Sequence, residues 1–172
     1  MLVACNALQQ GSPSGLGIEP FSAIESVLTS DSYNAKAQQL STKVMISTGI
    51  LNMDSTKKTE VIDLEDSNVI CEDLDDFPEQ RYGAVGANLA STPIVCGGYF
   101  GGPVQQTHSS DKCFKYTEEG WQHFATMIER GYSFAGIVYN DALYIFGGHD
   151  GDTNTILQSS EIVKEDGSST EG

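Results

Sequence analysis

The chain has 172 residues, of which 39% are hydrophobic, and this is enough for the packed core of one domain of ordinary size. Only 9 lysines and arginines stand against 24 aspartates and glutamates, which gives a net charge of −15. Because this charge repels phosphate groups, nucleic acid and anionic membrane surfaces are not expected as partners, whereas basic proteins and cations stay open. The sequence contains no run of eighteen apolar residues, so it predicts no transmembrane helix.

Residues 1–32 form a separate N-terminal segment, in which 21–28 could supply one strand ahead of the first repeat. The apolar start, residues 1–5, lacks a basic region and is shorter than the core of a secretory signal. The four cysteines are scattered, and without a C-x-x-C pair they argue against a zinc ribbon or a thioredoxin-like motif. The compartment stays open, with a cytoplasmic location favoured over secretion.

Three segments that begin with tyrosine and end with glycine recur at intervals of about fifty residues. Segment 82–98 reads YGAVGANLASTPIVCGG and segment 132–148 reads YSFAGIVYNDALYIFGG, so both end in a glycine doublet. Segment 33–49, YNAKAQQLSTKVMISTG, aligns with 82–98 without a gap. The repeats divide the rest of the chain into three units, a degenerate first unit and two fuller ones: 33–81, 82–131 and 132–172.

Each unit holds short apolar runs separated by turn-rich loops, and the run lengths and β-branched content predict strands with almost no helix. In the middle unit we expect four strands, near 82–89, 93–98, 112–116 and 121–126. Asn140 and Asp141 suit a tight turn between the first two strands of the last unit. The last unit ends without a segment that matches a fourth strand, so we expect its third strand, 161–164, to be an edge.

The order of an arginine, an aromatic residue, two strands, a glycine doublet, a variable loop and a tryptophan resembles the kelch repeat. Seven residues carry the resemblance: Arg81, Gly97, Gly98, Trp121, Arg130, Gly147 and Gly148. It covers residues 33–164 and departs from the pattern in the first unit, where Thr48 replaces a glycine and Cys71 stands near the tryptophan position. The resemblance implies an all-β fold of about three four-stranded β-propeller blades that form an incomplete ring.

The long loops between the second and third strands of each unit, 50–59, 99–111 and 149–159, emerge at one end of such a blade together with the connections between units. The resemblance implies a non-catalytic module, an adaptor or scaffold, that binds a protein partner through these loops. The candidate partner-binding residues are Tyr99, Phe100, Gln105, His108, His149, Asp150 and Asp152.

We expect no metal, cofactor or catalytic residue. Oxygen-bearing side chains alternate over 150–154 as in a calcium loop, but Thr155 stands where such a loop needs glycine. The three histidines match no nucleophile-and-base pattern. Two other functions stay open: part of a larger propeller enzyme, an oxidase or a hydrolase, and a secreted kelch protein stabilised by disulfides.

Cys96 and Cys113 fall on adjacent strands within bridging reach, but their counterparts in the last unit are apolar. We therefore expect two small buried core residues and no bond between them. Gly147→Val is expected to damage folding more than any single change in 149–159, because valine does not tolerate positive φ or close packing. A ring of three blades leaves apolar faces uncovered, so we also expect the chain to self-associate or aggregate.

Overall fold

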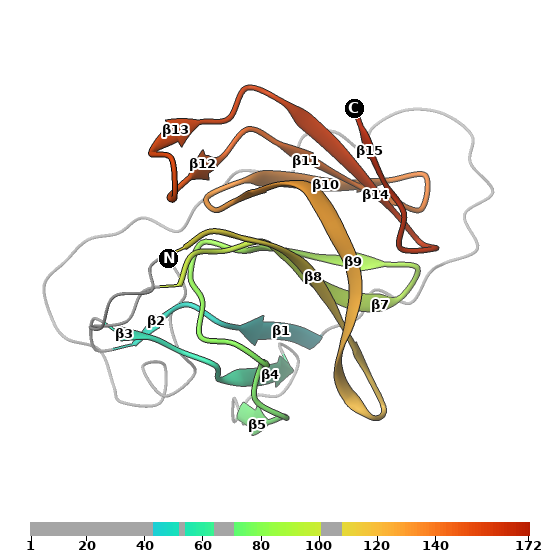
Figure 1. Cartoon of the computed structure of the whole chain (residues 1–172). Coiled ribbons are helices and arrows are strands. Elements are labelled where there is room, and N and C mark those ends of the chain that lie inside the picture. The colour runs from blue at the N-terminus through green and yellow to red at the C-terminus, as the bar shows by residue number, and fades with distance from the viewer. Residues whose placement is uncertain (1–42, 52–53, 64–70, 101–107) are drawn as a thin grey trace, which may run out of the picture.

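The computed structural model describes residues 43–51, 54–63, 71–100 and 108–172, and every regular element within these ranges is a β-strand (Figure 1). Three open antiparallel sheets follow one another in chain order, from the blue-green strands through the green and orange ones to the red ones. The predicted all-β class is confirmed. Within the described ranges, no helix has the length and apolar character needed to cross a membrane.

The first sheet belongs to the first unit and has the strand order β1-β4-β5. Its strands are β1 (Lys43–Ser47), β4 (Thr59–Asp63) and β5 (Cys71–Asp73). A two-stranded hairpin lies between them, made of β2 (Ile50–Leu51) and β3 (Asp54–Ser55). The first strand expected after Tyr33, and the strand expected at 21–28, lie outside the described residues.

The second sheet has the order β6-β7-β8-β9, so its strands pair as the repeat predicts. They are β6 (Val85–Leu89), β7 (Thr92–Cys96), β8 (Ser110–Thr117) and β9 (Gly120–Gly131). β9 extends five residues beyond the predicted strand and carries register shifts against β8. Such irregularities bend a strand and increase its twist, which suits a long outer strand that reaches toward the next sheet.

The third sheet has the order β10-β11-β14-β15 and corrects one expectation. Its strands are β10 (Ala135–Tyr139), β11 (Ala142–Phe146), β14 (Ser160–Lys164) and β15 (Ser169–Glu171), and a small hairpin joins β12 (His149–Asp150) to β13 (Thr155–Ile156). The last unit therefore has a short fourth strand, because Ser169, Thr170 and Glu171 pair with β14. The segment has no apolar residue, so its pattern gave no strand signal, and it forms by backbone pairing with β14.

The predicted tight turn at Asn140 and Asp141 is confirmed. Both residues have positive φ, 48° and 55°, which is the backbone of a type I′ hairpin turn. Ala90 and Ser91 take the same conformation, 48° and 66°, between β6 and β7. The two units thus share this turn although only one of them carries the asparagine and aspartate that favour it.

Most of the core lies between the second and third sheets. Buried side chains of both sheets meet there: Val85, Leu89, Ile94, Cys96, Cys113, Ala125, Met127, Leu143, Ile145 and Val163. A smaller cluster of Phe77, Val95 and Phe114 lies between the first and second sheets and contacts Trp121. The second sheet therefore buries its two sides against different neighbours, the first sheet and the third.

Cys96 and Cys113 are fully buried, as expected, but they form a disulfide, which the sequence analysis did not favour. The two residues are direct partners in the pairing of β7 with β8. The comparison with the last unit pointed the wrong way, because that unit has no cysteines at the corresponding positions. There Phe146 of β11 pairs with Ser160 of β14.

Polar groups also join successive sheets. The Trp121 indole Nε1 donates to Thr59 Oγ1 at 3.1 Å, from the second sheet to the first. The buried carboxylate of Glu161 accepts the backbone N–H groups of Ile128 at 2.8 Å and Glu129 at 3.4 Å, from the third sheet to the second. Buried polar atoms need such partners, so these bonds fix how the sheets sit on one another.

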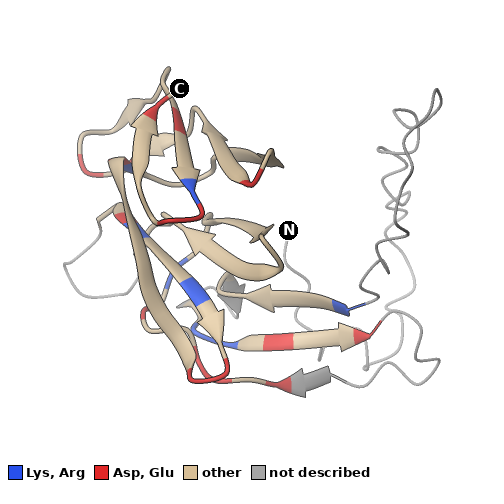
Figure 2. Cartoon of the chain, turned by 90° about the vertical axis from the view of Figure 1, so that its right-hand side faces the viewer, with Lys and Arg blue, Asp and Glu red and all other residues tan. Residues whose placement is uncertain are grey.

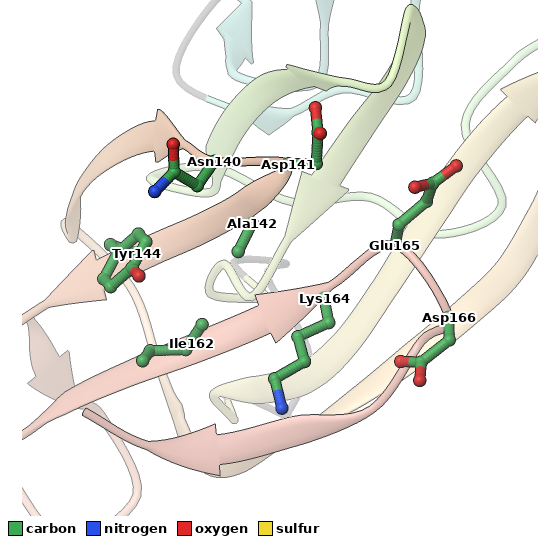
Figure 3. Close-up of a pocket in the computed structure, with 8 residues that line it drawn as sticks. All are labelled: Asn140, Asp141, Ala142, Tyr144, Ile162, Lys164, Glu165 and Asp166. Atoms are coloured by element: carbon green, nitrogen blue, oxygen red, sulfur yellow. The ribbon is translucent and has the colours of Figure 1, made fainter.

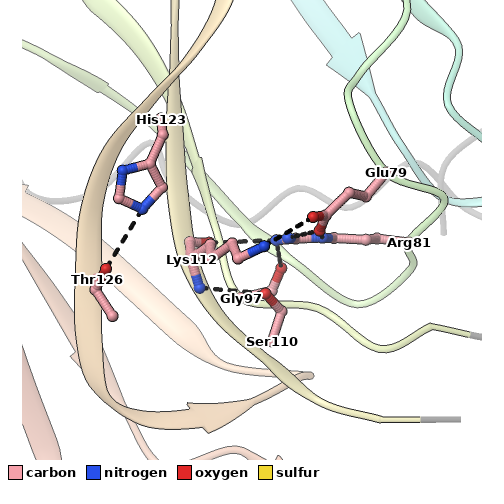
Figure 4. Close-up of polar contacts among 7 residues, drawn as sticks. All are labelled: Glu79, Arg81, Gly97, Ser110, Lys112, His123 and Thr126. Carbon is pink, nitrogen blue, oxygen red and sulfur yellow. Dashed lines mark hydrogen bonds and ion pairs between the residues drawn. The ribbon is translucent and has the colours of Figure 1, made fainter. Parts of the chain in front are cut away.

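Arg81 is fully buried and closes the junction between the first and second sheets (Figure 4). Its Nη1 donates to the carbonyl oxygens of Gly97 at 2.8 Å and Lys112 at 3.2 Å, while Nε and Nη2 donate to the Glu79 carboxylate. The guanidinium carbon also lies 5.3–5.4 Å from the centroids of three rings, Phe77, Phe100 and Phe114. Arg81 therefore has a structural role at this junction.

Arg130 does not share that role. Its side chain is 54% exposed and pairs with Asp152 at 3.1 Å. The residue that corresponds to Arg81 is Gly131, because Gly98 N–H donates to Gly131 O as Gly49 N–H donates to Arg81 O. One extra residue separates the arginine from the tyrosine in the last unit, and this shift moves Arg130 out of the buried position.

Candidate functional site

In the second and third units, the connection before the sheet pairs with the start of the long loop of the same unit. Tyr82 and Tyr99 exchange backbone hydrogen bonds at 3.1 and 2.9 Å, and Tyr132 and His149 do the same at 3.0 and 2.9 Å. The same two-bond bridge therefore places an aromatic pair at one end of the second sheet and another at the same end of the third. The repeat itself thus brings four aromatic residues to one end of the molecule.

The rings of these residues form a continuous cluster across the two units. Ring centroids lie 4.9 Å apart for Tyr99 and Tyr132, 5.5 Å for Tyr82 and Tyr99, and 6.0 Å for Tyr82 and Tyr132. His149 extends the cluster, with its ring 5.2 Å from that of Tyr132. All four residues are half-buried. We call this set, Tyr82, Tyr99, Tyr132 and His149, the aromatic cluster.

Hydrogen bonds from the loops hold the rim of the cluster. Gly151 N–H donates to Ser109 Oγ at 2.7 Å, and Ser109 N–H donates to Asp152 Oδ1 at 2.9 Å. These bonds tie the long loop of the last unit to that of the middle unit. Asp152 also holds Arg130, so the rim combines two backbone contacts with one ion pair.

Two titratable groups of this site have shifted pKa values, Tyr82 and Asp150. Burial, and then the neighbouring Tyr132 and Tyr99, raise the pKa of Tyr82, so its hydroxyl stays neutral. Burial alone would raise the pKa of Asp150, but hydrogen bonds from Asp152 and Thr153 and the charge of Arg130 lower it. The face therefore combines the neutral hydroxyl of Tyr82 with the ionised carboxylate of Asp150.

One polar atom in the aromatic cluster is buried without a partner. His149 Nδ1 makes no hydrogen bond with any described group.

The described part of the chain contains no cluster of three or more histidine, cysteine, aspartate or glutamate side chains that could bind a metal ion. In the same part, acidic residues outnumber basic ones and gather at turns and strand ends (Figure 2).

The structure brings together most of the predicted partner-binding residues. Tyr99 and His149 belong to the aromatic cluster, and Asp150 and Asp152 lie on the loop at its rim. Phe100 and His108 stack on each other with centroids 4.3 Å apart, and they lie directly before and directly after the undescribed part of the middle loop. Gln105 lies outside the described residues.

Sequence reasoning missed Tyr82, Tyr132 and Ser109 as members of the site. The two tyrosines were used only to mark where units begin. The repeat could have identified them, because the connections between units, which contain Tyr82 and Tyr132, emerge at the same end of the sheets as the long loops. The paired bridges of Tyr82 with Tyr99 and of Tyr132 with His149 show how that shared end becomes one surface.

Among known proteins, no family model matches this sequence, and no curated protein matches it. The fold does match solved structures. One of them, described as the structure of YjhT, superposes with a TM-score of 0.66 and 14% sequence identity over 76% of this chain. The matched region spans 42% of the YjhT chain, less than half its length. At this identity the likeness concerns the fold alone.

Proposed function

We propose that this chain is a kelch-type propeller segment that acts as a non-catalytic binding module and takes a protein partner on its aromatic cluster. The observation that carries the proposal is the contact between the Tyr99 and Tyr132 rings, at 4.9 Å, made by loops of two different units. The glycine doublets, the buried Arg81 and the stacked sheets support the kelch assignment.

The cluster has the properties of a binding hot spot. Tyrosine and arginine are enriched among residues that dominate binding energy, because each offers a large contact area with a polar end. The three tyrosines pack against each other, and backbone bridges hold all three in place, Tyr82 with Tyr99 and Tyr132 with His149. Little side-chain freedom is then left to lose on binding, which favours affinity.

Charge narrows the class of partner. The net charge of −15 attracts a cationic segment and accelerates its approach at low ionic strength. Lysine and arginine side chains also bind over aromatic faces, where the electrostatic field of the ring favours a cation. We therefore favour a basic peptide segment of a protein as the ligand, with Asp150 and Asp152 at the rim.

The test begins with a random peptide library displayed on phage and selected against the full chain. Tyr132→Ala is expected to weaken the selected peptides at least about tenfold, which is the lower range of hot-spot truncations. Tyr99→Ala should have a similar effect. Dissociation constants would be measured by fluorescence polarisation, with thermal melts to verify that the variants fold.

Glu118→Ala is the matched control, because Glu118 is exposed in the turn between β8 and β9, at the opposite end of the sheet. It should leave peptide binding unchanged. If folded Tyr99→Ala and Tyr132→Ala variants both bind the selected peptides as the unmodified chain does, the aromatic cluster is not the binding surface.

A further inference from the structure

The third sheet carries an exposed apolar surface on the side away from the second sheet. Pairing of β10 with β11 and of β11 with β14 places five large side chains on that side: Ile137, Tyr139, Tyr144, Phe146 and Ile162. Ile137 is 60% exposed, Tyr139 62% and Phe146 45%. We call these five residues the trailing face. Soluble proteins rarely leave such a face open unless something binds there.

The corresponding side of the second sheet is covered by the third sheet. Val85, Leu89 and Ile94 of that side are buried against Leu143, Ile145 and Val163 from the third sheet. The fit is close, because a Cβ added at Gly136 of β10 would lie 2.5 Å from Val85 Cγ2. The chain therefore already contains one example of how a trailing side is covered, namely by the next unit of the same kind.

The trailing face contains a hollow (Figure 3). It has a volume of about 640 Å³ and is lined by the turn residues Asn140 and Asp141, by Tyr144 and Ile162, and by Lys164. The matching hollow on the second sheet, between Leu89, Ile94 and Lys115, measures about 140 Å³. Glu165, from the turn of the third unit, forms part of its wall. The open hollow lies where the second sheet receives a turn of the next unit, and its wall carries Asp141, Glu165 and Asp166 beside Lys164.

The first sheet offers the opposite side of such a contact. The pairs Val44–Ile62 and Ile46–Glu60 in β1 and β4 match the pairs Leu143–Val163 and Ile145–Glu161 in β11 and β14. We call Val44, Ile46, Glu60 and Ile62 the leading face. Glu60 and Ile62 are buried within the chain itself, whereas Val44 is 42% exposed, so a docked unit would contact this face around Val44.

We infer that two copies of this chain dock head to tail, the trailing face of each on the leading face of the other. The contact continues the stacking that already joins the second sheet to the third. Two chains of three units would close a ring of six, within the four to eight units of known propellers.

Charge sets a condition on this assembly. Each copy carries −15, and the long-range repulsion between copies weakens as salt screens it. The apolar contact itself is not weakened by salt. The dimer is therefore expected to be tighter at high ionic strength, which distinguishes it from an association held by ion pairs.

The experiment is sedimentation equilibrium of the full chain, with expected mass twice the 18.5 kDa of one copy. Ile137→Lys on the trailing face and Val44→Lys on the leading face should each give monomers. Tyr139→Lys serves as a second trailing-face variant should Ile137→Lys fail to fold. The control is Ile156→Lys, on the β12–β13 hairpin, where the side chain is 75% exposed and outside both faces; this variant should stay dimeric.

Mixing the two monomeric variants gives the decisive result. The intact leading face of Ile137→Lys can bind the intact trailing face of Val44→Lys, so the mixture should recover a dimer with one complete contact. A monomeric unmodified chain in both low and high salt would overturn the inference. So would a dimer that survives Val44→Lys, because it would show a back-to-back contact of two trailing faces.

Discussion

Arg81→Ala is expected to lower the free energy of unfolding by about 3–5 kcal/mol, the range for breaking a buried ion pair by removing one partner. The loss leaves the carbonyl oxygens of Gly97 and Lys112 buried without the donor that they have in the structure. It also removes the guanidinium from three phenylalanine rings between the first and second sheets. Urea unfolding followed by tryptophan fluorescence would measure the change, since Trp121 lies in that junction.

Arg130→Ala is the matched control. This arginine also pairs with a carboxylate, that of Asp152, but its side chain is 54% exposed, and ion pairs at the surface contribute at most about 1 kcal/mol. If the two alanine variants lose equal stability, the distinction between the buried and the displaced arginine is wrong. Arg81→Lys should lie between them, because a lysine keeps the charge but cannot reproduce the forked set of donors.

The same junction gives a dependence on pH. Burial alone would raise the pKa of Glu79, but hydrogen bonds and charge from Arg81 and Lys112 lower it below the ordinary glutamate value. A lowered pKa means that the stabilisation is present above the unfolded-state value and is lost as the pH falls through the folded-state value. The unmodified chain should therefore lose stability in acid over that window more steeply than Arg81→Ala does.

Gly148→Ala is expected to cost about 2–5 kcal/mol of stability, from backbone strain and overpacking together. Gly148 has φ of 104°, outside the left-handed region that other residues enter. A Cβ there would lie 2.5 Å from the Phe134 ring and 3.0 Å from the Tyr132 carbonyl oxygen. Because one of these neighbours is backbone, rotation of a side chain does not relieve the contact. Thermal unfolding of the two chains would measure the loss.

Gly147→Ala should cost only about 1–2 kcal/mol, the strain of a left-handed backbone. Gly147 has φ of 59°, but the first atom that its Cβ would meet is Leu157 O at 3.5 Å, an ordinary contact. Of the two glycines of the doublet, Gly148 is therefore expected to tolerate a side chain less well. Equal losses of stability in Gly147→Ala and Gly148→Ala would show that the positive φ determines the cost and that the close contacts of the added Cβ do not.

The middle unit was the part of the fold that the sequence predicted best. Its strands are separated by turn residues, and the matching segments of the last unit show where each strand should begin and end. β15 was missed because Ser169, Thr170 and Glu171 are all polar, so no alternation of apolar residues predicts a strand there. The strand is formed by pairing with β14. The Cys96–Cys113 bond was missed because it depends on the pairing register of β7 and β8, which spacing alone leaves open.

The candidate site was predicted in part. Tyr99 and His149 follow the glycine doublets directly, so their place on the loops could be predicted from the repeat. Their contact with Tyr132 could not, because it depends on how closely the second and third sheets approach. Arg130 was assigned a structural role by its resemblance to Arg81, and one inserted residue was enough to move it to the surface.

The central claim is that loops of different units meet in one aromatic cluster. Nuclear Overhauser measurements on the full chain test it directly. They should show cross-peaks between the ring protons of Tyr99 and Tyr132, whose centroids are 4.9 Å apart. Tyr116 and Trp121, 5.2 Å apart within the second sheet, provide the internal reference. A clear Tyr116–Trp121 cross-peak with none between Tyr99 and Tyr132 would contradict the cluster, and with it the proposed binding surface.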